Sequence, residues 1–246
     1  IEHMTGGAEN SLGQAASREI DVMGARAEAA TVRRKRGSAV AGETTETEFL
    51  DAAERQFAEN GYAGAKIRAI ADAAKANLGA LHYYWGSKES LFKAACARRM
   101  APMIAERMAR FDALSKSPAS VEDILRAFFE PAFLSHRGDS LKRDLFCRIY
   151  TRMLTDPAPE VRAIVTDIFT EPTNRFVQLL RDACRNVDDA TFYWRLHCVF
   201  GVFQHAAGYT EDIGTLSEGR FDTSDLDMGI ENIIQFVAAG LTAPSR

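Results

Sequence analysis

The residues from Ile67 to Leu91 read IRAIADAAKANLGALHYYWGSKESL, and their periodicity fits two short helices separated by a tight turn. The apolar positions of the first helix recur at the spacing that buries one face: Ile67, Ile70, Ala71 and Ala74. Lys75 and Ala76 then form the turn, and the side chain of Asn77 can cap a second helix. This order of elements predicts a helix-turn-helix.

The second helix presents two different faces. Leu81 and Trp85 lie one turn apart and are predicted to point inward. The outer side carries small, hydrogen-bonding and aromatic residues: Leu78, Gly79, His82 and Tyr83. A helix that enters the major groove needs small residues for close approach to base edges and longer side chains for bases and phosphates. Ser87 is predicted to cap the following helix, with Lys88 at the rim as a phosphate ligand.

We therefore predict a DNA-recognition region in which some residues contact bases and others contact phosphates. The residues predicted to read bases are Asn77, Leu78, Gly79, Ala80 and His82. The residues predicted to hold phosphates are Lys66, Arg68, Tyr83 and Lys88.

The stretch from Thr47 to Phe92 resembles the DNA-binding domain of the tetracycline-repressor (TetR) family of transcriptional regulators. The matching landmarks are Ala53, Phe57, Gly61, Tyr62, Ile67, Ile70, Ala71, Leu81, Tyr83, Trp85, Ser87, Lys88 and Leu91. The resemblance implies a three-helix DNA-binding domain followed by a helical ligand-binding and dimerisation domain. It also implies a regulator, most often a repressor, that binds a near-palindromic operator as a dimer.

Length, composition and charge limit the classes of protein to which this chain can belong. With 246 residues and 46% apolar content, the chain can bury a sizeable core. No apolar run approaches the ~20 residues of a membrane span, and the N-terminus has no apolar signal segment, so we expect a cytoplasmic protein. The net charge is −4, but the segment from Arg33 to Arg99 carries +4 and the remainder −8. A basic segment on an acidic body is expected when one end touches DNA.

The chain divides by composition into three predicted parts: a flexible tail at 1–44, the helix-turn-helix domain at 45–92, and a helical effector-binding and dimerisation domain at 93–246. The tail carries a basic run of Arg33, Arg34, Lys35 and Arg36, shortly before the helix-turn-helix domain. Two interpretations of this run stay open, a solvated tail and an arm that contacts DNA phosphates or a minor groove.

The periodicity predicts helices throughout and no strand, hence an all-α fold. The predicted helices outside the helix-turn-helix are Thr47–Asn60, Lys88–Leu114, Val121–Leu134, Ser140–Leu154, Pro159–Asn186, Asp189–Tyr209 and Asp225–Leu241. Pro102 predicts a kink or a changed hydrogen-bond pattern in the long helix, and Pro172 predicts a bend or a break.

The body is rich in aromatic and thioether side chains. For most of them the simplest interpretation is core packing, but such a bundle can also enclose an apolar cavity between helices. We predict a small apolar effector, with an acyl compound as one candidate class, near Pro172. The candidate lining is Phe129, Phe146, Tyr150, Phe176, Trp194 and His197.

The last two predicted helices are apolar on more than one face, whereas a lone surface helix needs a single apolar stripe. In the resembled family this pair of helices forms a four-helix dimer interface, so we expect a homodimer through them.

Sequence motifs for enzymes, cofactors and metals are absent. The chain contains neither nucleotide-binding glycine fingerprint, no H-E-x-x-H and no G-x-S-x-G. We therefore expect no catalytic residues, cofactor or metal site. The rival class is an all-α protein that binds an acyl-type ligand and has no DNA function. An exposed face with His82, Tyr83 and Lys88 that binds duplex DNA would discriminate the two.

Overall fold

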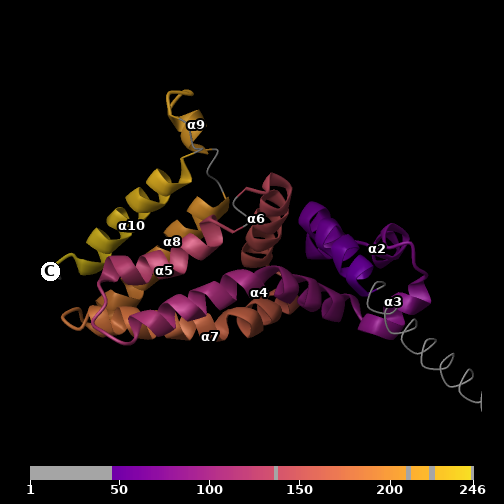
Figure 1. Cartoon of the computed structure of the whole chain (residues 1–246), viewed down its shortest axis with the longest axis horizontal. Coiled ribbons are helices and arrows are strands. Elements are labelled where there is room, and N and C mark those ends of the chain that lie inside the picture. The colour runs from indigo at the N-terminus through magenta and orange to yellow at the C-terminus, as the bar shows by residue number, and fades with distance from the viewer. Residues whose placement is uncertain (1–45, 136–137, 209–211, 222–224, 245–246) are drawn as a thin grey trace, which may run out of the picture. The chain divides into compact units, whose positions relative to one another are not determined.

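The computed structural model describes residues 46–135, 138–208, 212–221 and 225–244, which form helices joined by turns and loops (Figure 1). The first helix covers residues 46–64 and is called the 46–64 helix below. The others are α2 Ile67–Ala73, α3 Leu78–Trp85, α4 Lys88–Leu114, α5 Val121–Phe133, α6 Ser140–Thr155, α7 Pro159–Ala183, α8 Asp189–Gly208, α9 Asp212–Leu216 and α10 Leu226–Thr242. Within these ranges there is no strand, and the predicted all-α class is confirmed.

Capping side chains fix where several helices begin. Ser87 Oγ accepts from the Ser90 amide at 3.0 Å, as predicted, and α4 has the predicted bounds. Ser120, Asp139 and Asp225 accept in the same way at the starts of α5, α6 and α10. Each such oxygen accepts a hydrogen bond from an amide that would otherwise have no partner in the first turn. The capping residue therefore determines where the helix begins.

Other boundaries differ from the prediction. The first helix was expected to end at Asn60, but helical structure continues to residue 64 even though Gly61 has a φ of +67°. The short helix α9 was not predicted, because five residues carry too little periodicity. Neither α4 nor α7 ends at its internal proline, so the break considered at Pro172 does not occur.

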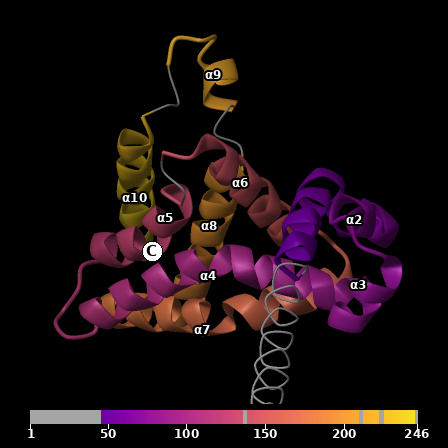
Figure 2. The same ribbon diagram turned by 45° about the vertical axis from the view of Figure 1, so that its right-hand side comes forward.

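The core of the body is a cluster of aromatic rings contributed by several helices. Phe128 of α5 stacks on Phe176 of α7 with ring centroids 4.1 Å apart and lies 4.9 Å from Phe203 of α8. In the chain, α5 packs against both α4 and α10 (Figure 2). The ring cluster therefore ties together elements that are far apart in sequence.

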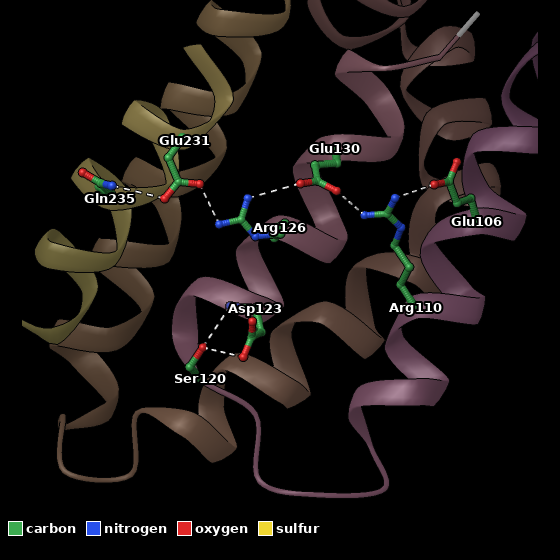
Figure 3. Close-up of polar contacts among 8 residues, drawn as sticks. All are labelled: Glu106, Arg110, Ser120, Asp123, Arg126, Glu130, Glu231 and Gln235. Carbon is green, nitrogen blue, oxygen red and sulfur yellow. Dashed lines mark hydrogen bonds and ion pairs between the residues drawn. The ribbon is translucent and has the colours of Figure 1, made fainter. Parts of the chain in front are cut away.

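A chain of ion pairs crosses the outer surface of α4, α5 and α10 (Figure 3). Arg110 of α4 bonds Glu106 and, at 2.5 Å, Glu130 of α5. Arg126 of α5 bonds Glu130 and, at 2.7 Å, Glu231 of α10. These groups are partly exposed, so each pair adds little free energy of folding, but the chain of pairs defines the register of the three helices.

The described residues from Phe49 onward form one compact unit. The helix α4 runs through residue 92, where the sequence predicted a domain boundary, so that boundary would divide functions along a continuous helix. None of the described helices has the length and apolar character that a bilayer span requires.

Candidate nucleic-acid interface and body pocket

The turn between α2 and α3 has the geometry of a helix-turn-helix. The Ala76 amide donates to the Ala71 carbonyl at 3.0 Å, and Lys75 adopts a φ of +54°. A positive φ favours glycine, so Lys75 occupies the position where the chain reverses at some cost in backbone energy. Ile70 and Ala71 are buried, and they hold α2 against the rest of the helix-turn-helix domain, residues 46–92, which we call the head.

The helix α3 has the two faces that the sequence predicts. Leu81 is fully buried and Trp85 is partly buried, whereas Leu78, Gly79, His82 and Tyr83 are exposed. Tyr83 is the most exposed large ring here, with 84% of its surface accessible. The anchored inner residues leave the outer face available to a partner.

Asn77 and His82 already make hydrogen bonds that limit what they can offer. Asn77 Oδ1 accepts from the Ala80 amide at 2.7 Å and so caps α3, which leaves its Nδ2 group to donate. His82 Nδ1 lies 3.2 Å from the Gly86 carbonyl. Because a carbonyl can only accept, Nδ1 carries the proton, and a neutral His82 keeps Nε2 as an acceptor.

The cations predicted to hold phosphates differ in their surroundings. Lys66 and Arg68 are exposed at the start of α2. Lys88 is half-buried: its Nζ donates to the Ala63 carbonyl at 3.3 Å and lies 5.0 Å from the centroid of the Tyr62 ring. Burial lowers the pKa of the Lys88 ammonium. Lys88 therefore also stabilises the end of the 46–64 helix, a role that the sequence did not suggest.

A buried carboxylate fastens the 46–64 helix to α4. Glu54 is 1% exposed and pairs with Arg99 and, at 2.7 Å, with Arg98, which also bonds Asp51 at 2.6 Å. We call this group the Glu54 clamp. The sequence did not predict this clamp, because Glu54 is separated from both arginines by more than forty residues. The one local indication of a buried ion pair is that an acidic residue lies beside the apolar stripe of its helix.

A second link joins the same helix to α6. Arg152 Nε donates to the Ala58 carbonyl and Nη2 to the Glu59 carbonyl, each at 3.0 Å. A guanidinium carries several N–H donors in one plane, so it can bond two neighbouring main-chain carbonyls at once. The position of α6 is thereby coupled to the helix that supports α2 and α3.

The body contains a pocket of about 200 Å³ beside Pro172. Its lining comes from α4, α5, α6, α7 and α8: Arg107, Phe128, Tyr150, Leu154, Val165, Phe169, Pro172, Thr173, Phe200, Phe203 and Gln204. The volume is below the ~300 Å³ at the low end for ligand pockets, so only a compact molecule fits without rearrangement.

The predicted pocket residues are only partly brought together. Tyr150 lines this pocket, whereas Phe129, Phe146 and Phe176 are buried in the core and are not in its lining. Trp194 and His197 face away from it on the exposed side of α8, and Trp194 is 73% exposed. Sequence periodicity could identify apolar faces but not which face of α8 meets Pro172.

The exposed apolar residues of the last helices form a further candidate interface. Large apolar side chains are exposed on α8 and on α10: Tyr193, Trp194, Met228 and Phe236. The predicted arm residues, Arg33, Arg34, Lys35 and Arg36, lie outside the described residues. Among the residues that the structure does describe, no cluster of three or more His, Cys, Asp or Glu could hold a metal ion.

Comparison with known proteins finds one family at both ends of the chain. Residues 49–95 match the profile of bacterial regulatory proteins of the tetR family, and residues 126–240 match the tetracyclin repressor-like C-terminal domain. The curated HTH-type transcriptional repressor AcnR of Corynebacterium glutamicum is 42% identical over 62 residues, which covers 24% of this chain and 33% of AcnR. The AcnR of Corynebacterium diphtheriae is 40% identical over the same share. The match therefore spans about a third of these relatives.

Solved structures share the fold at low identity. FadR from Bacillus subtilis, solved in complex with stearoyl-CoA, is 18% identical with a TM-score of 0.58, and the match covers 79% of this chain and 98% of FadR. A TetR-like transcriptional regulator from Rhodococcus sp. RHA1 is 21% identical with a TM-score of 0.55, over 81% of this chain and 97% of that one.

Proposed function

Because this chain belongs to the tetracycline-repressor family of transcriptional regulators, we propose that it is a DNA-binding regulator, acting as a repressor, whose α3 docks in the major groove of an operator. The observation that carries this proposal is the exposed outer face of α3 behind a helix-turn-helix of the right geometry. We assign DNA binding to residues 45–92 and effector binding and dimerisation to residues 93–246.

Base reading falls to the outer face of α3. Leu78, Gly79 and Ala80 are small or apolar enough for the helix to approach base edges closely, and Leu78 suits a thymine methyl group. His82 Nε2, as an acceptor, suits the amino group of adenine or cytosine in the major groove. Asn77 contributes its Nδ2 donor, since its oxygen caps the helix.

Phosphate binding falls to Lys66, Arg68, Tyr83 and Lys88 around that face, and to the basic run from Arg33 to Arg36 if it acts as an arm. Phosphate contacts fix the docking register but carry no sequence information. Deleting the residues before Ala41 should lower the log–log salt slope of binding by ~0.9 for each phosphate that the arm neutralises. An unchanged slope would leave the run as a solvated tail.

A homodimer through α8 and α10 would place two heads on one twofold axis. The exposed rings of Tyr193, Trp194 and Phe236 supply apolar surface that a partner copy would bury. The two heads then bind the same face of the duplex, so the centres of the two half-sites are separated by one or more helical turns of ~34–36 Å each. A monomer at micromolar concentration, measured by sedimentation with and without DNA, would contradict this part.

An effector that binds the body would release the operator by favouring a different spacing of the heads. A ligand with equal affinity for both arrangements shifts nothing, so binding must be coupled to the head. The structural supports for coupling are α4, which continues from head to body, and Arg152, which joins α6 to the 46–64 helix.

Binding of the full chain to a randomised operator library tests the division of roles. His82→Ala should change the preferred sequence at a cost of ~1–3 kcal/mol, whereas Arg68→Ala should weaken all duplexes alike and flatten the salt slope. Arg68 serves better than Lys88 here, because Lys88→Ala also removes a bond to the Ala63 carbonyl. Lys142→Ala on α6 is the matched control. Uniform loss in both head variants would refute the assigned roles, and no binding to any duplex would refute the function.

A further inference from the structure

Arg107 is a buried cation at the centre of the aromatic core. Its side chain is 1% exposed on α4. The guanidinium carbon lies 4.1 Å from the centroid of the Phe128 ring and 5.3 Å from that of Phe203, and Nε donates to the Phe128 carbonyl at 2.8 Å. Nη2 is buried and has no hydrogen-bond partner. Among the described residues, no carboxylate forms an ion pair with this group.

This arrangement is incomplete as a set of interactions. Removing a guanidinium from water is costly unless an anion and further hydrogen bonds replace its hydration. Two ring contacts and one carbonyl compensate part of that cost, but they leave the charge unneutralised and both N–H donors of Nη2 unused. An anion bound beside Arg107 would supply both missing interactions.

The pocket beside Pro172 offers the space for such an anion. Arg107 lines it and is the charged residue of the lining, in which no Asp, Glu or Lys appears among the described residues. Tyr150, Thr173 and Gln204 add polar groups, and Gln204 Nε2 already donates to the Leu154 carbonyl at 3.3 Å. The other lining residues are aromatic or aliphatic. The site thus combines one positive charge with an apolar wall.

We propose that this pocket binds a small monocarboxylic acid, with its carboxylate at the Nη2 edge of the Arg107 guanidinium and its apolar part against Phe128, Phe169 and Phe200. The inference rests on the effector-binding role proposed above and names the chemical class of the effector. A planar guanidinium matches a carboxylate by paired N–H donors. A phosphate dianion would need a second cation, which the described lining does not provide.

The volume sets the size of the acid. An engineered apolar cavity of ~150 Å³ holds benzene, so a pocket of about 200 Å³ suits a single ring or a short chain with one carboxylate. A long acyl chain would require the helices to separate. The acid expected here is therefore compact and carries a charge, whereas the sequence alone suggested a small apolar effector with an acyl compound as one candidate class.

The same residues connect the pocket to the DNA-binding head. Arg107 lies on α4, the helix that also carries Arg98 and Arg99 of the Glu54 clamp. Tyr150 and Leu154 lie on α6 on either side of Arg152, which bonds the end of the 46–64 helix. An acid that draws Arg107 toward itself, or that displaces α6, would alter both attachments of that helix.

The test measures binding of acid and amide pairs to the full chain by isothermal titration calorimetry. The probes are benzoate, phenylacetate, cyclohexanecarboxylate and hexanoate, each beside its neutral primary amide of nearly equal shape. At least one acid should bind roughly tenfold to a hundredfold more tightly than its amide, since the carboxylate completes charge-assisted bonds. Arg107→Met should abolish this preference and Arg107→Lys should restore part of it. Arg148→Met, on the exposed side of α6, should keep it in full.

Two results would overturn the assignment: no acid binds more tightly than its amide, or Arg107→Met keeps the preference. Operator binding, followed by fluorescence anisotropy in the same samples, separates this inference from the proposed function. Intact DNA binding without any acid preference refutes the carboxylate site alone. An Arg107-dependent preference with no effect on the operator supports the site and refutes its role as the effector switch.

Discussion

One buried charge, Glu54, is paired with α4 from the 46–64 helix, and another, Arg107, lies on α4 itself; the two differ in how the chain compensates them. In the head, Glu54 is 1% exposed and is paired with both Arg98 and Arg99. In the body, Arg107 is equally buried and has no carboxylate among the described residues, only ring faces and one carbonyl. The clamp completes its interactions within the chain, as a structural element should. The incomplete surroundings of Arg107 are those of a binding site.

Arg99 shows which property separates the two sites. Its Nε is also buried without a hydrogen-bond partner, so an unused donor alone does not mark a ligand site. What differs is charge: the Arg99 guanidinium is neutralised by Glu54, whereas that of Arg107 is not. If this contrast holds, substitutions should lower the free energy of unfolding most at the clamp and least at Arg107.

Glu54→Gln should give the largest loss, about 3–5 kcal/mol, because removing one partner of a buried pair leaves the other charges uncompensated. Arg98 keeps Asp51, which places the expected value toward the low end. The measurement is the midpoint of urea unfolding. Glu59→Gln, at an exposed position of the same helix, is the matched control, and equal midpoints for the two variants would show that the clamp is not a stability element.

Arg152→Met should cost less, about 1 kcal/mol, because its two bonds to the Ala58 and Glu59 carbonyls are partly exposed to water. The more telling effect is on coupling: operator binding should persist, while its release by an effector weakens. Arg148→Met on the same helix controls for loss of an exposed arginine. Unchanged release in Arg152→Met would remove α6 from the proposed route between pocket and head.

The sequence predicted the head well because its signals are local. The spacing of Ile67, Ile70 and Ala71, the Asn77 cap and the Ser87 cap all act within a few residues, and each is where it was expected. Whether the exposed residues of α3 contact DNA stays a prediction. The fold of the body followed from the same periodicity, with the helix α9 as the omission.

The pocket could not be predicted in the same way, because its lining depends on contacts between distant helices. Arg107 is buried by Phe128 and Phe203, which lie on α5 and α8. In sequence it stands among the charged residues of a long helix and resembles its solvated neighbours. Conversely, Trp194 looks like a core residue by composition but lies on an exposed face outside the pocket, the face that we propose as the dimer interface.

Glu231→Gln should cause a smaller loss than either variant above, since the ion pairs of Figure 3 are exposed and screened. The hydrogen bond from Arg126 lowers the pKa of the Glu231 carboxyl below its usual 4.5. A lowered pKa in the folded state gives stability that is present above pH 4.5 and disappears as the pH falls through the folded value. Melting temperatures of the wild type and Glu231→Gln should therefore converge on acidification, and a constant difference from about pH 7 to about pH 3 would contradict this.

Arg107→Met should cause the smallest loss, close to zero, and is the direct counterpart of Glu54→Gln. Methionine fills a similar volume among the rings and removes a buried charge that the chain does not neutralise. Removing the desolvation cost of the charge offsets the loss of the ring interactions and of the hydrogen bond to the Phe128 carbonyl. That carbonyl lies within α5, so it keeps a hydrogen-bond partner in the helix. Urea unfolding without ligand should give a midpoint near that of the wild type. A carboxylic acid that binds the wild type should then raise its midpoint and leave that of Arg107→Met unchanged. A loss of ~3 kcal/mol in the variant, comparable to Glu54→Gln, would make Arg107 a structural anchor like the clamp and end the contrast between the two sites.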